Sequence, residues 1–199
     1  MKNLYIDSNV ILTLIRHLDS EFLYVRDLFL QKQLNFITST LTIVELFSVF
    51  SREEEILQNA LIEISKHLKS KKIFTLTTFE QIQMIIRYLL ALSNTQVVSD
   101  PDLEPFNIVN STNINQKTDN FKIYPFSKLA IKQASDSSLK TLDNLHLSAA
   151  RYFDEFFNLK ISYLVTLDEN FLAKKHLINR ITNILIIHPK SVLELEKIL

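Results

Sequence analysis

Residues 2–12 read KNLYIDSNVIL, a short apolar run that ends in an acid before a second apolar run begins. The first run is rich in branched and aromatic side chains, which predicts a buried strand. Asp7 then stands at the carboxyl end of that strand. In an open parallel sheet this edge is where ligands bind, so Asp7 is a candidate for chemistry. The alternative is that Asp7 or Ser8 caps the helix that follows, and other acids beside Asp7 would decide between the two.

The composition limits the classes of function. The chain has 199 residues, of which 47% are hydrophobic and 22% charged, as expected for one soluble globular domain. Its formal net charge is 0, so a bound polyanion must be held by a local patch or by metal ions. The chain has no cysteine, which excludes disulfides, thiolate metal sites and a cysteine nucleophile. It also has no glycine, which excludes glycine-rich phosphate-binding loops.

No apolar run reaches the about 18 residues of a membrane span, and the chain begins with a strand pattern rather than a signal-peptide pattern. We therefore expect a cytoplasmic protein with no membrane partner.

Apolar strand-like runs alternate with runs of helical spacing along the chain. This alternation predicts an α/β fold, a three-layer α/β/α sandwich with a central, mostly parallel sheet of about five strands. Strands are expected before Asp7 and at 34–38, 71–76, 161–166 and 184–187, and helices at 10–17, 20–33, 41–51, 53–68, 79–92, 125–134, 138–158, 171–176 and 189–199.

Residues 94–124 differ from the rest of the chain. They are rich in Asn, Ser and Thr, contain two prolines, and carry more acids than lysines. Such a long polar stretch is typical of an insertion, whose acids we interpret as a solvated surface. We expect residues 1–199 to form one domain that contains this insertion.

Four acids stand in apolar or strand-terminal contexts: Asp7, Glu45, Asp143 and Asp168. Glu45 lies in an otherwise apolar helix, and Asp168 follows the strand at 161–166. If the four converge at the carboxyl edge of the sheet, their mutual repulsion requires protonation or bound cations. Hard oxygen ligands favour Mg²⁺ or Mn²⁺.

Four segments carry these acids: YIDSNVI (5–11), TIVEL (42–46), LDNLHLSAA (142–150) and VTLDENF (165–171). In this order they resemble the PIN-domain ribonucleases, a family that includes VapC-type toxins. The resemblance covers residues 1 to about 92 and about 138 to 190, and leaves out the insertion.

The resemblance implies a metal-dependent endoribonuclease that cuts RNA phosphodiester bonds. It implies that Asp7, Glu45 and Asp143 hold the principal Mg²⁺ or Mn²⁺ ion, and that Asp168 completes the ring or forms a second site. It also implies a homodimer and, for a toxin, an antitoxin protein whose extended segment crosses the acidic cleft with an Arg or Lys.

Other polar residues accompany these acids. Asn9 and Thr166 match family positions that support the acids through hydrogen bonds. His146 lies on the same helical face as Asp143, within reach of the site, but we interpret it as a packing or hydrogen-bonding residue. Lys140 either contacts a phosphate or lies on a solvated helix face.

Two other functions remain as alternatives. The first is a catalytically weak or inactive PIN-fold protein that serves in RNA binding or assembly, which the neutral charge and acidic insertion favour. The second is a phosphatase with an aspartyl nucleophile. That class expects a second acid two residues after the first, where this chain has Asn9, so it ranks last.

Overall fold

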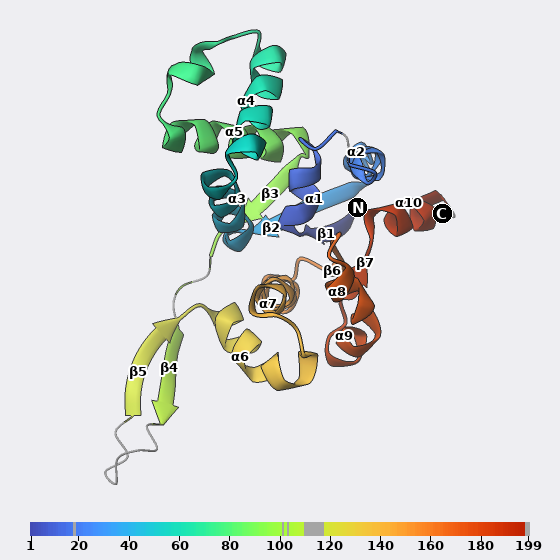
Figure 1. Ribbon diagram of the computed structural model, residues 1–199. Coiled ribbons are helices and arrows are strands. Elements are labelled where there is room, and N and C mark those ends of the chain that lie inside the picture. Colours follow the sequence, from blue (N-terminus) through green and yellow to red (C-terminus); the bar gives the residue numbers. More distant parts are fainter. Residues whose placement is uncertain (18, 101, 103, 110–117, 198–199) are drawn as a thin grey trace.

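The computed structural model describes residues 1–17, 19–100, 102, 104–109 and 118–197. Across these residues, five parallel strands form one sheet in the order β3-β2-β1-β6-β7 (Figure 1). The strands are β1 (Lys2–Ile6), β2 (Leu34–Ser39), β3 (Thr95–Val98), β6 (Ile161–Val165) and β7 (Leu185–Ile187). Because β1 is the central strand, the residue that follows it lies at the middle of the carboxyl edge.

Helices cover both faces of the sheet (Figure 1). One layer contains α1 (Ser8–Thr13), α2 (Phe22–Phe29), α3 (Thr40–Arg52), α4 (Glu54–Leu68), α5 (Thr78–Leu92) and α10 (Pro189–Lys197). The other contains α6 (Pro125–Ser137), α7 (Thr141–Phe157), α8 (Glu169–Ala173) and α9 (Lys175–Ile181). No helix among the described residues is long and apolar enough to cross a membrane.

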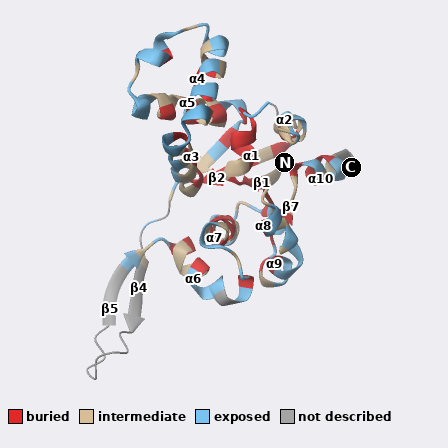
Figure 2. Cartoon of the chain, viewed as in Figure 1, coloured by how far each residue is buried: buried red, intermediate tan, exposed pale blue. Residues whose placement is uncertain are grey.

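The alternation of side chains along β1 explains the two layers. Successive residues of a strand point to opposite faces, so Leu4 and Ile6 pack in the core with α1 to α5, and Tyr5 packs in the core with α6 to α9. All three side chains are fully buried, and Figure 2 shows the buried residues concentrated where helices meet the sheet. The three-layer α/β/α fold with a parallel sheet is therefore as predicted.

The strand expected at residues 71–76 is wrong. This segment forms the 3₁₀ helix η1 (Lys72–Thr75) between α4 and α5. Ile73 is buried there, but Phe74 and Thr75 are exposed. A segment with a single buried side chain does not supply the apolar surface of a strand covered by helices, so local turn formation prevails.

The third strand of the sheet comes instead from the segment read as an insertion. β3 follows α5 after Asn94, whose φ of 48° is in the left-handed region that Asn tolerates. Beyond it, β4 (Glu104–Val109) and β5 (Thr118–Ile123) form an antiparallel hairpin that projects from the body (Figure 1). Lys128 of α6 contacts Glu104 at 3.4 Å near the base of this hairpin. Residues 110–117 lie outside the described part of the chain.

Candidate active site

Asp7 is placed by the start of α1. It is the N-cap of that helix, and its Oδ1 accepts a hydrogen bond from the backbone N–H of Ser8 at 2.7 Å. Its Oδ2 accepts one from the hydroxyl of Thr166, also at 2.7 Å. The residue is 6% exposed. The capping role and a chemical role therefore coexist, because a capped carboxylate still presents its remaining lone pairs.

Thr166 and Asn9 form a small network that fixes Asp7. Thr166 Oγ1 accepts hydrogen bonds from Asn9 Nδ2 at 3.1 Å and from the N–H of Asp168 at 3.0 Å, while its proton goes to Asp7. Asn9 Oδ1 accepts the N–H of Leu167 at 3.1 Å. The network joins the start of α1 to the end of β6, so the carboxyl ends of the two strands are held together.

Glu45 reaches the same place from α3, in the first helical layer. Its Oε2 accepts a hydrogen bond from His146 Nε2 at 2.7 Å. Burial acts to raise the pKa of Glu45, but the hydrogen bond and charge of His146, with a hydrogen bond from Ser8, lower it below its usual value. Glu45 is thus held as a carboxylate inside the protein.

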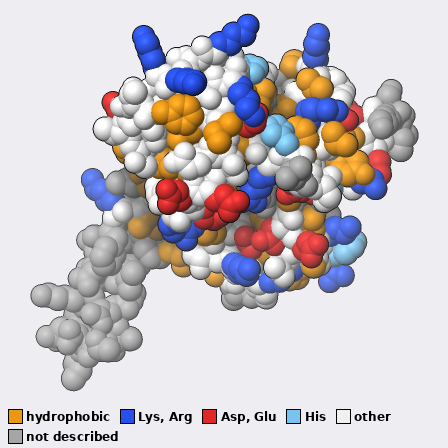
Figure 3. All heavy atoms as spheres, turned by 45° about the horizontal axis from the view of Figure 1, so that its top comes forward, with side chains coloured by type: hydrophobic (Ala, Val, Ile, Leu, Met, Phe, Trp, Pro, Cys, Tyr) orange, Lys and Arg blue, Asp and Glu red, His pale blue; other side chains and the backbone are white. Residues whose placement is uncertain are grey.

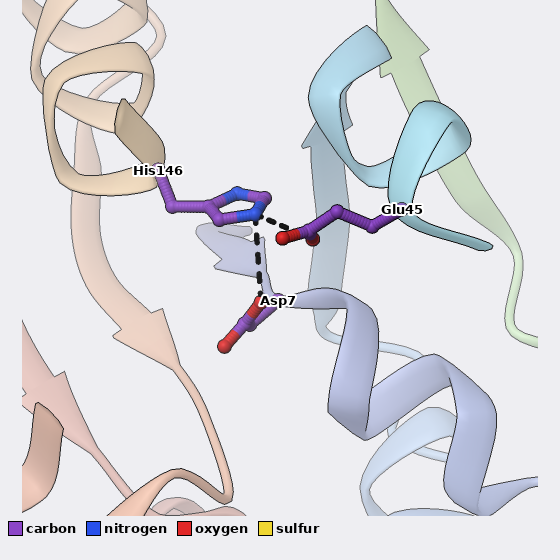
Figure 4. A group of neighbouring side chains, drawn as sticks. All are labelled: Asp7, Glu45 and His146. Atoms are coloured by element: carbon purple, nitrogen blue, oxygen red, sulfur yellow. Dashed lines mark hydrogen bonds and ion pairs between the residues drawn. The ribbon is translucent and has the colours of Figure 1, made fainter. Parts of the chain in front are cut away.

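His146 comes from α7, in the opposite layer, and is 2% exposed. Figure 4 shows its imidazole directed at Glu45 and at Asp7, whose Oδ1 is 3.7 Å from Nε2. On the other side of the ring, Nδ1 lies 2.9 Å from the hydroxyl of Tyr5, which in turn lies 2.7 Å from Ser39 Oγ. Burial alone would lower the pKa of His146, but Tyr5, the hydrogen bond to Glu45 and the charges of Asp7 and Glu45 raise it well above the ordinary value.

Asp143 and Asp168 complete the group. Asp143 lies in the first turn of α7, and burial together with the charges of Asp168 and Asp7 raises its pKa, against the opposing effect of Lys140 and His146. Asp168 is the N-cap of α8, and its Oδ1 accepts the N–H groups of Asn170 and Phe171. The pKa of Asp143 is therefore raised first by its partial burial and then by the neighbouring carboxylates of Asp168 and Asp7.

These side chains line a cavity of about 390 Å³. Its walls contain all four acids predicted from the sequence, together with Ser8, Asn9, Lys140, Thr141, Leu142 and His146. The acids reach it from four separate segments of the chain. On the face shown in Figure 3, acidic side chains gather mainly along the middle, and most Lys and Arg side chains lie toward its margins.

The cluster could hold a divalent cation. Asp7, Glu45 and His146 each offer one ligand atom, and these atoms lie within 4.8 Å of one another. Asp143 and Asp168 add two carboxylates to the same cavity. A set dominated by carboxylate oxygens suits Mg²⁺ or Mn²⁺, and such a charge would offset the repulsion that Asp168 and Asp7 add to the effect of burial on Asp143.

Sequence reasoning missed part of this arrangement. The hydrogen-bonding role expected for His146 is present, with Glu45 and Tyr5 as its partners, and the residue also lines the cavity. No sequence pattern assigns a role to Tyr5. A usable signal existed, because Tyr5 lies in β1 two residues before Asp7, and His146 follows Asp143 by three on the same face of α7.

No protein-family model matches the chain, and no curated protein matches it. Among solved structures, the chain is similar to a chain in the crystal structure of VapBC2 from Rickettsia felis, bound to a DNA fragment from their promoter. The alignment covers 94% of this chain and 98% of that chain, with 15% sequence identity and a TM-score of 0.47.

Proposed function

We propose that this protein is a metal-dependent endoribonuclease of the PIN-domain type that hydrolyses RNA phosphodiester bonds. The observation that carries the proposal is that Asp7, Glu45, Asp143 and Asp168 line one cavity at the carboxyl edge of the sheet. These are the acids of the four sequence segments that resemble the PIN-domain ribonucleases. Two follow strands and two come from helices in opposite layers, so their convergence is a property of the fold and not of local sequence.

The four acids of the cavity would bind the ion, and Lys140 would bind the RNA. The four carboxylates would hold Mg²⁺ or Mn²⁺, with Asp7 fixed in place by Ser8 and Thr166. When bound, such an ion lowers the pKa of a water molecule and stabilises negative charge on the attacked phosphate. Lys140, exposed at the rim of the cavity, offers a point charge to an RNA phosphate.

The reaction needs no covalent intermediate with the protein. The oxygen of water bonds to phosphorus as the bond from phosphorus to the 3′ oxygen breaks. The 3′ oxygen takes up a proton, and the products carry a 3′-hydroxyl and a 5′-phosphate.

The test is cleavage of end-labelled RNA with Mg²⁺ or Mn²⁺, and with EDTA. We expect the wild type to cleave RNA when Mg²⁺ or Mn²⁺ is present and to leave 5′-phosphate ends. The variants Asp7→Asn and Asp143→Asn should cleave RNA no faster than the wild type does in EDTA. Asp27→Asn is the matched control, because Asp27 is exposed on α2 and pairs with Arg26. Wild-type rates in Asp7→Asn, or products with 2′,3′-cyclic phosphate ends, would contradict the proposal.

One observation favours the alternative of an RNA-binding or assembly protein without catalysis. His146 already places a cationic side chain between Glu45 and Asp7, so the chain itself offsets part of the negative charge. Calorimetric titration with Mn²⁺ separates the two functions. Binding at millimolar or lower concentration supports the nuclease, and its absence supports the alternative.

The resemblance to VapC-type toxins also supports a partner protein. We propose an antitoxin segment with an Arg or Lys that enters the acidic cavity and pairs with its carboxylates. Such a segment would compete with Mn²⁺ for the same side chains. A homodimer is proposed on the same resemblance, and light scattering of the purified protein tests it.

A further inference from the structure

His146 stands in the position of a metal ligand. Its Nε2 is 2.7 Å from Glu45 Oε2 and 3.7 Å from Asp7 Oδ1. Two ligands of one ion at about 2.1 Å can be at most about 4.2 Å apart, so both separations are compatible with ligands of a single ion. The nitrogen and the two oxygens arrive from α7, α3 and the end of β1, on three sides of the same point (Figure 4).

The surroundings of the imidazole are those of a ligand histidine. A metal-bound imidazole normally donates its other ring N–H to a fixed acceptor, which sets the tautomer and the ring orientation. Here Nδ1 faces the hydroxyl of Tyr5, and that hydroxyl faces Ser39 Oγ, all of them buried. With Nδ1 protonated, Tyr5 accepts from His146 and donates to Ser39, which leaves Nε2 free for an ion.

The hydrogen-bonded series His146–Tyr5–Ser39 also holds the imidazole in place when no ion is bound. Nε2 then carries a proton and donates it to Glu45, as the 2.7 Å distance indicates. When an ion binds, the Nε2 proton would leave to solvent. Because Glu45 Oε2 lies only 2.7 Å from Nε2, close to the N–H direction, Glu45 would have to shift so that both atoms could hold one ion at about 2.1 Å.

We propose that His146 is a nitrogen ligand of the metal, an inference that rests on the proposed metal-dependent nuclease. A nitrogen ligand alters which ion the site prefers. Mg²⁺ takes oxygen ligands almost exclusively, whereas imidazole suits first-row transition ions such as Fe²⁺, Ni²⁺ and Zn²⁺, a series in which Mn²⁺ is the weakest binder. The ratio of Mn²⁺ affinity to Mg²⁺ affinity should therefore be higher at this site than at a site made only of carboxylates.

The decisive measurement is pulsed electron paramagnetic resonance of Mn²⁺ bound to untagged protein that carries ¹⁵N-labelled histidine. We expect ¹⁵N coupling to Mn²⁺ in the wild type and its loss in His146→Gln. His176→Gln is the matched control, since His176 is exposed on α9 and outside the cavity, and it should retain the coupling. Thermal unfolding by circular dichroism verifies that each variant is folded.

Calorimetry supplies a second readout. His146→Gln should lower Mn²⁺ affinity by at least about tenfold and Mg²⁺ affinity by less, so that the ratio of the two affinities falls. Tyr5→Phe keeps the ring and removes the hydroxyl, and it should weaken Mn²⁺ binding while the ¹⁵N coupling persists. Should His146→Gln fail to fold, the labelled wild type and Tyr5→Phe still decide the question.

The outcomes separate this inference from the proposed function. Mn²⁺ bound without ¹⁵N coupling overturns the histidine ligand and leaves a carboxylate nuclease intact. Coupling without any RNA cleavage upholds the ligand and overturns the nuclease. No binding of Mn²⁺ by the wild type overturns both.

Discussion

At the scale of single residues, Glu45 and His146 stabilise each other's charged forms inside the protein. Glu45 is ionised more readily than a free carboxyl, and His146 protonated more readily than a free imidazole. A buried pair of this kind offsets its own desolvation only while both charges are present. Its contribution to stability is therefore lost both at low pH, where Glu45 is protonated, and at high pH, where His146 is neutral.

The pH dependence of stability without metal follows from these shifts. The pKa of Glu45 is lowered from 4.5, so its contribution is present above pH 4.5 and lost as pH falls through the lowered value. The pKa of His146 is raised from 6.5, so its contribution is complete below pH 6.5 and lost as pH rises through the raised value. In EDTA, the loss of Tm caused by His146→Gln should be largest between pH 4.5 and 6.5.

Thermal melts of wild type and His146→Gln in EDTA, from acidic pH through this range to alkaline pH, check the prediction. The gap in Tm should narrow at alkaline pH, where the wild-type imidazole has lost its proton. His176→Gln provides the baseline for losing an exposed histidine. A gap of constant size at every pH would mean that His146 contributes packing and no charge.

The positions of the acids could be predicted from sequence, whereas their mutual contacts could not. Asp7 and Asp168 end apolar runs, and Glu45 interrupts one, so each is conspicuous in the linear chain. The pairing of Glu45 with His146 joins residues 101 positions apart through side chains from opposite layers. That contact depends on how α3 and α7 pack on the sheet, which no local pattern contains.

At the scale of elements, α7 carries Asp143 and His146 into the site, and α6 anchors it through a buried polar cluster. Asn144 Nδ2 donates to the carbonyl of Ala130 at 2.7 Å, and Gln133 Nε2 donates to Asn144 Oδ1 at 2.9 Å and to Ser148 Oγ at 2.7 Å. Polar partners inside an interface allow fewer alternative alignments than apolar contacts do. The cluster therefore sets how far α7 extends its first turn toward the cavity.

Asn144→Ala should destabilise the protein by about 1–3 kcal/mol, because it removes one of the two acceptors of the buried Gln133 amide and the side-chain donor to the carbonyl of Ala130. It should also weaken Mn²⁺ binding, because Asp143 precedes Asn144 in the same turn. Urea denaturation and calorimetry measure the two effects. Asn59→Ala on α4, an exposed position, should change neither. An unaltered midpoint in urea would show that the cluster does not anchor the helix.

The strands show where local sequence patterns mislead. The run KKIFTL at 71–76 has the composition of a strand, yet it forms η1, while the polar start of TQVV at 95–98 concealed β3. The difference lies in position, since β3 has an exposed neighbouring edge of β2 to pair with as soon as α5 ends. Availability of a partner strand outweighs propensity for short segments.

At the scale of the whole molecule, charge is balanced overall and unevenly placed. The formal net charge is 0, with acidic side chains gathered along the middle of one face and basic ones mostly around them (Figure 3). An RNA strand held near the cavity would meet few cations, so its binding should release few counterions. We expect the affinity for RNA to fall only gently with salt.

Lys140→Ala tests this weak basic contact. It should raise KM for RNA with little change in kcat, because a phosphate contact at the rim acts equally on bound substrate and transition state. The slope of log KM against log salt should fall by about 0.7 for one lost phosphate contact on a single strand. Lys175→Ala, exposed on α9, is the control. An equal drop in kcat would place Lys140 at the reacting phosphate instead.

The acidic cavity draws Glu45 from one helical layer, His146 and Asp143 from the other, and Asp7 from the strand between them. Neither helical layer alone supplies all of the side chains that line the cavity. A ribosome that has released the chain only as far as α6 has made Asp7 and Glu45 but not their counterparts. The proposed nuclease therefore requires the whole sandwich, and a nascent chain that still lacks α7 is expected to cut no RNA.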